Sequence, residues 1–163
     1  MARQRAFSGT PWEEQVGYCR ALRVGQQVFV SGTSPSDGQG GTYAPGDAYA
    51  QTHRCFEIIQ QALEAVGATL SDVVRTRIYV TDMARWPDIA RAHRELFADH
   101  PPCNTTVAIA ALINPDMLVE IEVEALCDQG PPTALSARAL GRPIEAATLP
   151  PIAAAELDEG CLD

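Results

Sequence analysis

The sequence predicts an α+β domain in which two helices cover one face of a mixed β-sheet of four to six strands. Two kinds of periodicity support this class. Residues 73–81 and 117–126 alternate between apolar and polar side chains, which is typical of strands. Residues 56–66 and 86–97 repeat apolar side chains at spacings of three and four, which is typical of helices with one buried face. Turns rich in glycine and proline separate these segments.

The ends of the predicted elements carry recognisable signals. Asp47 is expected to cap the first helix, and Gly67 to follow its last turn. The pair Pro101-Pro102 stops the second helix, and Asn114-Pro115-Asp116 forms a turn before the last strand. In chain order we predict a hairpin over 18–33 with its turn at 25–26, a loop over 34–46, a helix over 47–66, a strand over 73–81, a helix over 86–99, and strands over 104–112 and 117–126.

The side chains of the middle strand and second helix predict which faces are buried. In the strand over 73–81, the side that faces the helices should hold Val74, Thr76, Ile78 and Val80, and the other side Arg75, Arg77 and Tyr79. In the second helix, the buried stripe should hold Trp86, Ile89, His93, Leu96 and Phe97. We expect the second sheet face also to carry mid-sized side chains, with Tyr79, Val30 and Ala108 as examples. Another copy of the chain is therefore expected to cover that face.

The chain divides into two parts by composition. Residues 1–128 form the predicted domain, whose size suits one hydrophobic core. Residues 129–163 contain five prolines, many alanines and acidic groups near the end, with no strand pattern. This composition predicts a flexible acidic tail; the alternative is a segment that wraps around a neighbouring subunit.

Composition excludes several classes of function. The net charge is −9 and no basic patch is visible, which argues against nucleic acid as a partner. No apolar run approaches the roughly 20 residues of a membrane span. The five cysteines lack a CxxC spacing, so neither a disulfide framework nor a metal site is expected, and a reducing, cytoplasmic location fits best. No HExxH, GxSxG, Walker-loop or Rossmann fingerprint is present.

Several residues could take part in chemistry, each with a plainer alternative. The Ser31-Gly32 loop can offer backbone N–H groups to an anion, or be a simple turn. Glu120 can hold a water and move its proton in a cleft, or lie on a solvent face with Glu122 and Glu124. Cys103 can be a partly exposed site residue or an inert thiol. His93 lies on an apolar stripe and is expected to be a packed histidine.

Three stretches together resemble the Rid (YjgF/YER057c/UK114) family in order and spacing. They are YCRALRVGQQVFVSGTSP, LSDVVRTRIYVTDMARWPDIARAHRELF and PPCNTTVAIAALINPDMLVEIEVEAL, and together they indicate that about residues 16–127 resemble the family. The resemblance implies a chorismate-mutase-like fold and a homotrimer with a central β-barrel and ligand clefts between subunits. It also implies hydrolysis of reactive imines and enamines, such as 2-aminoacrylate, without a metal or an organic cofactor.

The resemblance also implies a set of site residues. Tyr18, Ser31, Gly32 and Glu120 match the family's tyrosine, its Ser-Gly loop and the glutamate thought to position water. Asn104 stands where the family has a substrate-binding arginine, and Ala90 where the family has a helix asparagine. An asparagine side chain offers two N–H donors and no charge, so the bidentate clamp on a carboxylate is lost. Either a cation comes from elsewhere, with Arg20 and Arg77 as candidates, or the substrate differs.

We therefore expect a Rid-like hydrolase or deaminase that acts on a small imine, enamine or related carbonyl-derived compound in an altered cleft. Glu120 would be catalytic, and Tyr18, Ser31, Gly32, Asn104 and Cys103 would line the substrate. The alternatives are a trimer of the same fold that binds a small molecule without catalysis, and a structural or regulatory protein whose acidic tail contacts a partner.

Overall fold

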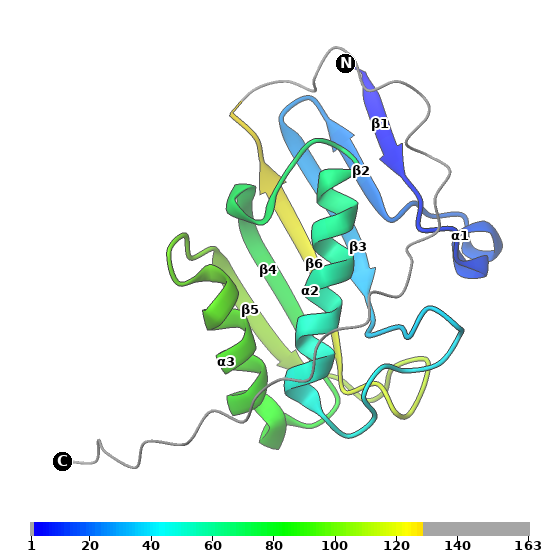
Figure 1. The fold of residues 1–163 in the computed structure, drawn as a ribbon, viewed down its shortest axis with the longest axis vertical. Coiled ribbons are helices and arrows are strands. Elements are labelled where there is room, and N and C mark those ends of the chain that lie inside the picture. Colours follow the sequence, from blue (N-terminus) through cyan, green and yellow to red (C-terminus); the bar gives the residue numbers. More distant parts are fainter. Residues whose placement is uncertain (1, 129–163) are drawn as a thin grey trace.

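A computed structural model describes residues 2–128, and the predicted tail at 129–163 lies outside the described residues. One six-stranded sheet runs through the molecule in the order β1-β2-β3-β6-β4-β5 (Figure 1). All neighbouring strands are antiparallel except β4 and β5, so the sheet is mixed. The strands are β1 (Arg3–Ala6), β2 (Ala21–Val24), β3 (Gln27–Thr33), β4 (Val73–Val80), β5 (Cys103–Ala108) and β6 (Val119–Leu126).

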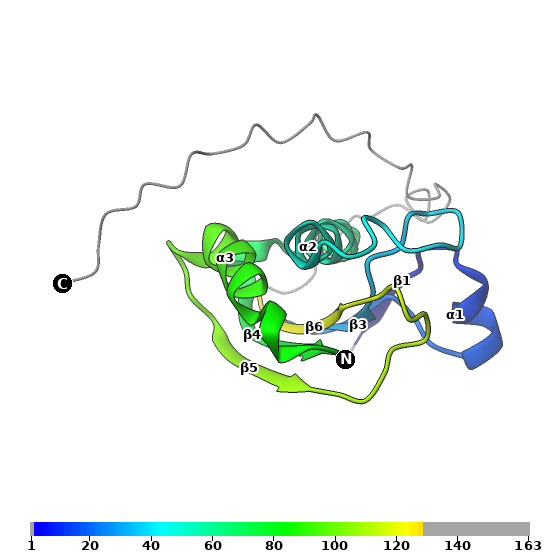
Figure 2. The same cartoon turned by 90° about the horizontal axis from the view of Figure 1, so that it is seen from below.

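Two long helices, α2 (Ala48–Glu64) and α3 (Trp86–Phe97), lie side by side on one face of the sheet (Figures 1 and 2). A short helix α1 (Pro11–Val16) follows β1, and single 3-10 turns, η1 (Leu70–Asp72) and η2 (Met83–Arg85), precede β4 and α3. This arrangement confirms the predicted α+β class and the two helices over a mixed sheet.

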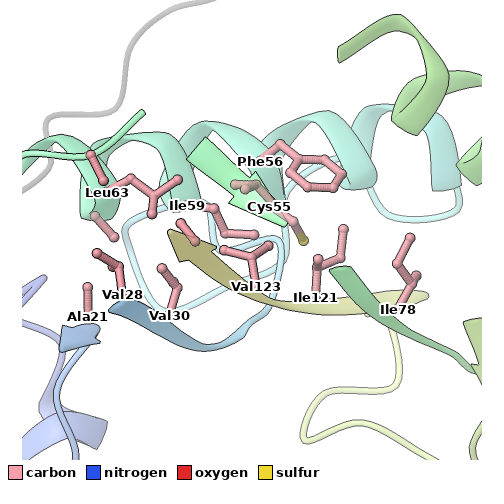
Figure 3. Packing of buried hydrophobic residues seen from close by; sticks show 14 of the residues in the cluster. Ala21, Val28, Val30, Cys55, Phe56, Ile59, Leu63, Ile78, Ile121 and Val123 are labelled. Carbon is pink, nitrogen blue, oxygen red and sulfur yellow. The ribbon is translucent and has the colours of Figure 1, made fainter. Parts of the chain in front are cut away.

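The core fills the space between α2 and the central strands. Apolar side chains at spacings of three and four on α2 point onto the alternate, inward-facing positions of the strands, as the two periodicities require (Figure 3). The labelled members from α2 are Cys55, Phe56, Ile59 and Leu63, and those from the strands are Ala21, Val28, Val30, Ile78, Ile121 and Val123.

Three predicted boundary residues of the helices and strands are confirmed. The carboxylate of Asp47 accepts a hydrogen bond from the backbone N–H of Ala50 at 2.9 Å and so caps α2. Gly67 follows α2 with φ of 73°, a left-handed conformation that other residues rarely adopt. Gly25 has φ of 64° in the turn between β2 and β3, where the hairpin was predicted.

The first sixteen residues correct the sequence prediction, which placed no element there. The strand β1 pairs with β2, and α1 returns the chain to Tyr18. Tyr18 itself precedes the strand, because β2 begins only at Ala21. Short elements with mostly exposed side chains carry little hydrophobic periodicity, so their signal in the sequence is weak.

Four side chains do not lie where the sequence predicts them. Ala108 pairs with Val80, which faces the helices, so it does not belong to the second sheet face. Val74 is exposed, because the β4–β6 register shifts between Val73 and Arg75 and turns Val73 inward. Val30 belongs to the core, so it does not contribute to the second sheet face. Trp86 is 49% exposed at the start of α3, and the buried positions of that helix are Ile89, Ala92 and Phe97.

The face of the sheet away from the helices carries a network of charged groups. Arg77 forms ion pairs with Glu122 and Glu124, each at 2.9 Å. Tyr79 donates a hydrogen bond to Glu122 at 3.2 Å. The exposed apolar residues on or beside this face are Phe29, Val107 and Leu126. The predicted segregation of Arg75, Arg77 and Tyr79 to this side is confirmed.

Candidate functional site

Glu120 lies at the start of β6, on the sheet face away from the helices, between buried Val119 and Ile121. Its carboxylate accepts a hydrogen bond from the Ser34 hydroxyl at 2.6 Å. The other carboxylate oxygen lies over Gly32, so close that a Cβ added to Gly32 would lie 2.5 Å from it. Gly32 therefore makes room for the carboxylate, and Ser34 fixes its orientation.

The Ser31-Gly32 segment is an irregular stretch of β3. The register against β6 shifts between Val30 and Thr33, which frees the intervening backbone from regular pairing. The Ser31 hydroxyl donates to the carbonyl of Cys19 at 2.9 Å. This bond ties the loop to the segment that carries Tyr18, so the two predicted features are brought together.

Arg20 joins the same group of residues. Its Nη2 donates to the carbonyl of Gly32 at 2.7 Å, and its guanidinium carbon lies 5.4 Å from the centre of the Tyr18 ring. A cation at this distance from an aromatic ring is attracted by the ring's electrons. The structure thus gathers Tyr18, Arg20, Ser31, Gly32, Ser34 and Glu120, which we call the Glu120 cluster.

Asn104 and Cys103 lie outside the Glu120 cluster within one chain. They are on β5, which is separated from β3 by β6 and β4. Asn104 Nδ2 donates to the Thr76 hydroxyl at 2.9 Å, on the helix side of the sheet. Glu120 pairs with Tyr79 on the opposite side. Cys103 is exposed at the start of β5. One chain therefore presents two separate sets of predicted site residues.

Comparisons with known proteins agree with this fold. The sequence profile of the family described as endoribonuclease L-PSP matches residues 11–127. The crystal structure of Rv2704 from Mycobacterium tuberculosis, a member of the YjgF/YER057c/UK114 family, is 44% identical, with a TM-score of 0.70; the match covers 77% of this chain and 99% of that one. The chain belongs to the Rid (YjgF/YER057c/UK114) family. The predicted family membership is confirmed.

Two further proteins are similar to this chain. The protein SCO2049 of Streptomyces coelicolor is 36% identical over 122 residues, which are 75% of this chain and 90% of the relative. The 3-aminoacrylate deaminase RutC of Acinetobacter baylyi is 35% identical over 104 residues, which are 64% of this chain and 82% of RutC. A deaminase is thus among the relatives of this Rid-family chain.

Two residues near the predicted site were not predicted from the sequence to take part in it. Ser34 stands in a Gly/Pro/Ser loop, where a serine is ordinary, and only the fold brings its hydroxyl to Glu120. Thr76 is a buried polar residue on β4 whose hydroxyl accepts from Asn104 and lies 3.0 Å from His93 Nε2. The signal available for Thr76 was its place on the apolar side of an alternating strand, since buried polar groups need partners.

His93 packs as expected and makes one polar contact. Its ring lies 4.7 Å from that of Phe97 and 5.8 Å from that of Phe56, measured between centroids. The Thr76 hydroxyl lies 3.0 Å from His93 Nε2 and can either donate to that nitrogen or accept from it. The burial of His93 lowers its pKa, which favours the neutral ring. The packing and the burial together indicate a neutral, structural histidine.

Acidification should therefore weaken the fold through His93. The folded protein resists protonation of this ring, so the unfolded chain binds the proton first as pH falls below about 6.5. We expect unfolding free energy, measured by urea titration between pH 7.5 and 5, to fall with a slope of at most about 1.4 kcal/mol per pH unit. The variant His93→Gln should flatten this dependence; an unchanged slope would contradict the assignment.

Among residues 2–128, no group of three or more histidine, cysteine, aspartate and glutamate side chains is placed to hold a metal ion. No helix in that part of the chain combines the length and the apolar character required to cross a membrane. Cys19, Cys55, Cys103 and Cys127 carry free thiols.

Proposed function

We propose that this protein is a deaminase that hydrolyses small reactive imines and enamines, releasing ammonia. The observation that carries the proposal is the carboxylate of Glu120, which Ser34 holds at 2.6 Å in the space left by Gly32. A half-buried carboxylate with a fixed orientation can bind a water and take its proton. The 35% identity to the 3-aminoacrylate deaminase RutC supports the same reaction class.

The proposed reaction uses water alone as the second reactant. An enamine first becomes the imine by moving a proton from nitrogen to carbon. Glu120 then takes a proton from water as the water oxygen forms a bond to the imine carbon, and the C=N electron pair moves to nitrogen, which receives that proton from Glu120 to give a carbinolamine. Glu120 next takes the hydroxyl proton as the C=O bond forms and the C–N bond breaks, and passes it to the departing nitrogen. The products are ammonia and a carbonyl compound, and Glu120 ends as it began.

A homotrimer with clefts between subunits would unite the two separate sets of residues. The Glu120 cluster lies in the segment before β2, at the end of β3 and on β6, whereas Asn104 and Cys103 lie on the edge strand β5. A neighbouring β5 placed at the Glu120 cluster would complete the predicted site. The exposed Phe29, Val107 and Leu126 support burial of this sheet face. The predicted central β-barrel, built from the three sheets, would bury it.

Assembly can be measured directly. Light scattering coupled to size exclusion should give three times the 17.5 kDa chain mass across a tenfold range of protein concentration. A stable monomer would contradict the assembled cleft. A monomer that still turned over an imine would also show that Asn104 is not needed.

The remaining parts of the proposal concern the cleft and its surroundings. Asn104 and Cys103 would contact the substrate, with Asn104 donating hydrogen bonds where the predicted family arginine is replaced. No cofactor or metal takes part in the proposed reaction. The net charge of −9 argues against RNA as a substrate, because phosphate backbones bind to basic surfaces. The four free thiols described above support a reducing, cytoplasmic location.

The variant Glu120→Gln tests the deaminase proposal. It keeps a side chain of similar size and cannot act as a base, so kcat/KM should fall by about 10²–10⁴-fold. 2-Aminoacrylate would be generated with a dehydratase and the release of pyruvate followed, alongside uncharged imines and enamines. The matched control is Glu122→Gln, two residues along the same face, whose carboxylate pairs with Arg77. The control should retain turnover.

The alternative is a trimer that binds a small molecule without changing it. The loss of the predicted family arginine at Asn104 favours this reading, because substrate binding is altered. If no imine or enamine reacts faster with the native protein than with Glu120→Gln, the enzyme proposal is wrong. Binding of the same compounds, with equal affinity in both proteins, would then support the non-catalytic alternative.

A further inference from the structure

Gln51 is a buried residue in the first turn of α2 whose side-chain amide binds two loops at once. The residue is 0% exposed. Its Nε2 donates to the carbonyls of Asp116 at 2.8 Å and Ala44 at 3.2 Å, and its Oε1 accepts from the backbone N–H of Leu118 at 2.8 Å. A glutamine amide has two N–H donors, so both are used within the protein and none is left for a ligand.

The two loops that Gln51 binds flank the Glu120 carboxylate. The loop over 34–46 begins with Ser34, whose hydroxyl donates to Glu120 at 2.6 Å. The other loop leads into β6, and Leu118 stands two residues before Glu120. Both loops lie beside the end of α2 at which this helix begins (Figure 1). One buried side chain therefore fastens the donor and the acceptor of this hydrogen bond to the same helix.

The loop over 34–46 is strained where Gln51 contacts it. Ala44 has φ of 44°, and in the described part of the chain it is the one residue other than glycine with a left-handed conformation. The Cβ atom makes that conformation unfavourable. One turn along α2, the buried Arg54 donates from Nε to the carbonyl of Ser36 at 2.9 Å and so holds the same loop nearer its start. The strained conformation persists because the helix fixes the loop at two points.

Strand pairing does not fix Glu120 on both sides. On the β4 side, Glu120 is paired with Tyr79. On the β3 side, the pairing of β6 begins only at Ile121, because the register is interrupted there. A shift of about 1 Å in either loop would stretch the 2.6 Å bond between Ser34 and Glu120 past the limit of about 3.0 Å that is usual for O–H···O hydrogen bonds.

We propose that Gln51 is a positioning residue, which sets the place of the Glu120 carboxylate against the Ser34 hydroxyl without touching the substrate. This inference rests on the proposed deaminase function and deepens it. Because Gln51 is fully buried, its effect passes through the two loops that it binds. Its removal should therefore lower kcat, which depends on the placement of Glu120, far more than it changes KM.

The test compares Gln51→Met with Thr52→Val. Methionine fills a similar volume and makes no such hydrogen bonds, so both loops are released. Thr52 is also 0% exposed, but its hydroxyl donates to the carbonyl of Ala48 within α2 itself. Both variants should have lower melting temperatures. Gln51→Met should lower kcat for the deamination by about 10-fold to 10²-fold and keep KM within about twofold, whereas Thr52→Val should keep both.

A second measurement needs no substrate. In protein labelled with carbon-13 glutamate, the carboxyl resonance of Glu120 is assigned from its absence in Glu120→Gln. Gln51→Met and Ser34→Ala should shift this resonance in the same direction, because both remove the hydrogen bond from the carboxylate. Thr52→Val should leave it in place. Gln51→Glu keeps the shape and loses at least one of the two N–H donors, so it repeats the comparison if the methionine variant does not fold.

Three results would overturn the positioning role of Gln51. The first is a Glu120 resonance that does not move in the Gln51 variant. The second is a loss of kcat no greater than that of Thr52→Val, which would mean that Gln51 only stabilises the fold. The third is a rise in KM with unchanged kcat. If the native protein hydrolyses no imine or enamine, the deaminase proposal fails, and the Glu120 resonance alone then decides whether Gln51 positions the carboxylate.

Discussion

The variant Gly32→Ala should lose deaminase activity while keeping its fold. The added methyl group would lie 2.5 Å from Glu120 Oε1 and 3.2 Å from the carboxyl carbon, so the carboxylate must swing away. That movement breaks its hydrogen bond with Ser34. Because the side chain of Glu120 is flexible, the cost in unfolding free energy should be small. Misplacing a catalytic group by about 1 Å can cost about 10²-fold in kcat/KM, which is the expected loss.

A double-variant comparison separates displacement of Glu120 from general damage. Ser34→Ala, which removes one hydrogen bond without adding bulk, should give a smaller loss of kcat/KM. In a Glu120→Ala background, adding Gly32→Ala should change neither activity nor thermal stability, since the clash is gone. If Gly32→Ala lowers activity further in that background, the glycine has a separate role and the displacement explanation fails.

The variant Arg23→Met should destabilise the fold strongly. Arg23 is 1% exposed, and its guanidinium donates to the carbonyls of Val66 and Gly67 at 2.9 and 2.8 Å and to Gly25 at 3.0 Å. These bonds attach the end of α2 to the β2–β3 hairpin. Methionine can fill the space and cannot donate, so the carbonyls lose their partners. We expect a loss of about 2–4 kcal/mol in unfolding free energy, measured by chemical denaturation.

The control for Arg23 is Arg5→Met on β1. Arg5 is exposed, so the same change of chemistry should alter unfolding free energy by less than about 0.5 kcal/mol. A loss at Arg23 no greater than that at Arg5 would show that the carbonyls find other partners. If assembly contributes to stability, both variants must be compared at one protein concentration.

The central part of the fold was predictable because burial there follows simple periodicity. The strands β4 and β6 and the helices α2 and α3 each have one buried side, and their sequences show it. The prediction for Val74 was wrong because a register shift reverses the alternation, and a bulge leaves no mark in the hydrophobic pattern. The β1 strand is defined by its pairing with β2, a long-range property that a local pattern does not contain.

The candidate site was predictable in part. The resemblance of the sequence to the Rid family selected Tyr18, Ser31, Gly32 and Glu120, and the fold brings these together. The burial of Arg20 and its contacts with Gly32 and the Tyr18 ring depend on how the chain folds, so the sequence alone does not show them. The side chain of Asn104 donates a hydrogen bond to Thr76 on the neighbouring parallel strand, and sequence spacing alone does not predict this contact.

The two edges of the sheet differ in a way that matters before any partner is present. The outer strand β1 carries Arg3 and Arg5, and charged side chains on an edge discourage strands of other molecules from adding to it. The opposite edge, β5, has the sequence CNTTVA, with no charge and mostly exposed side chains. A newly made chain is therefore protected from aggregation at one edge and open to it at the other. The same open edge makes β5 the natural strand for selective pairing between copies.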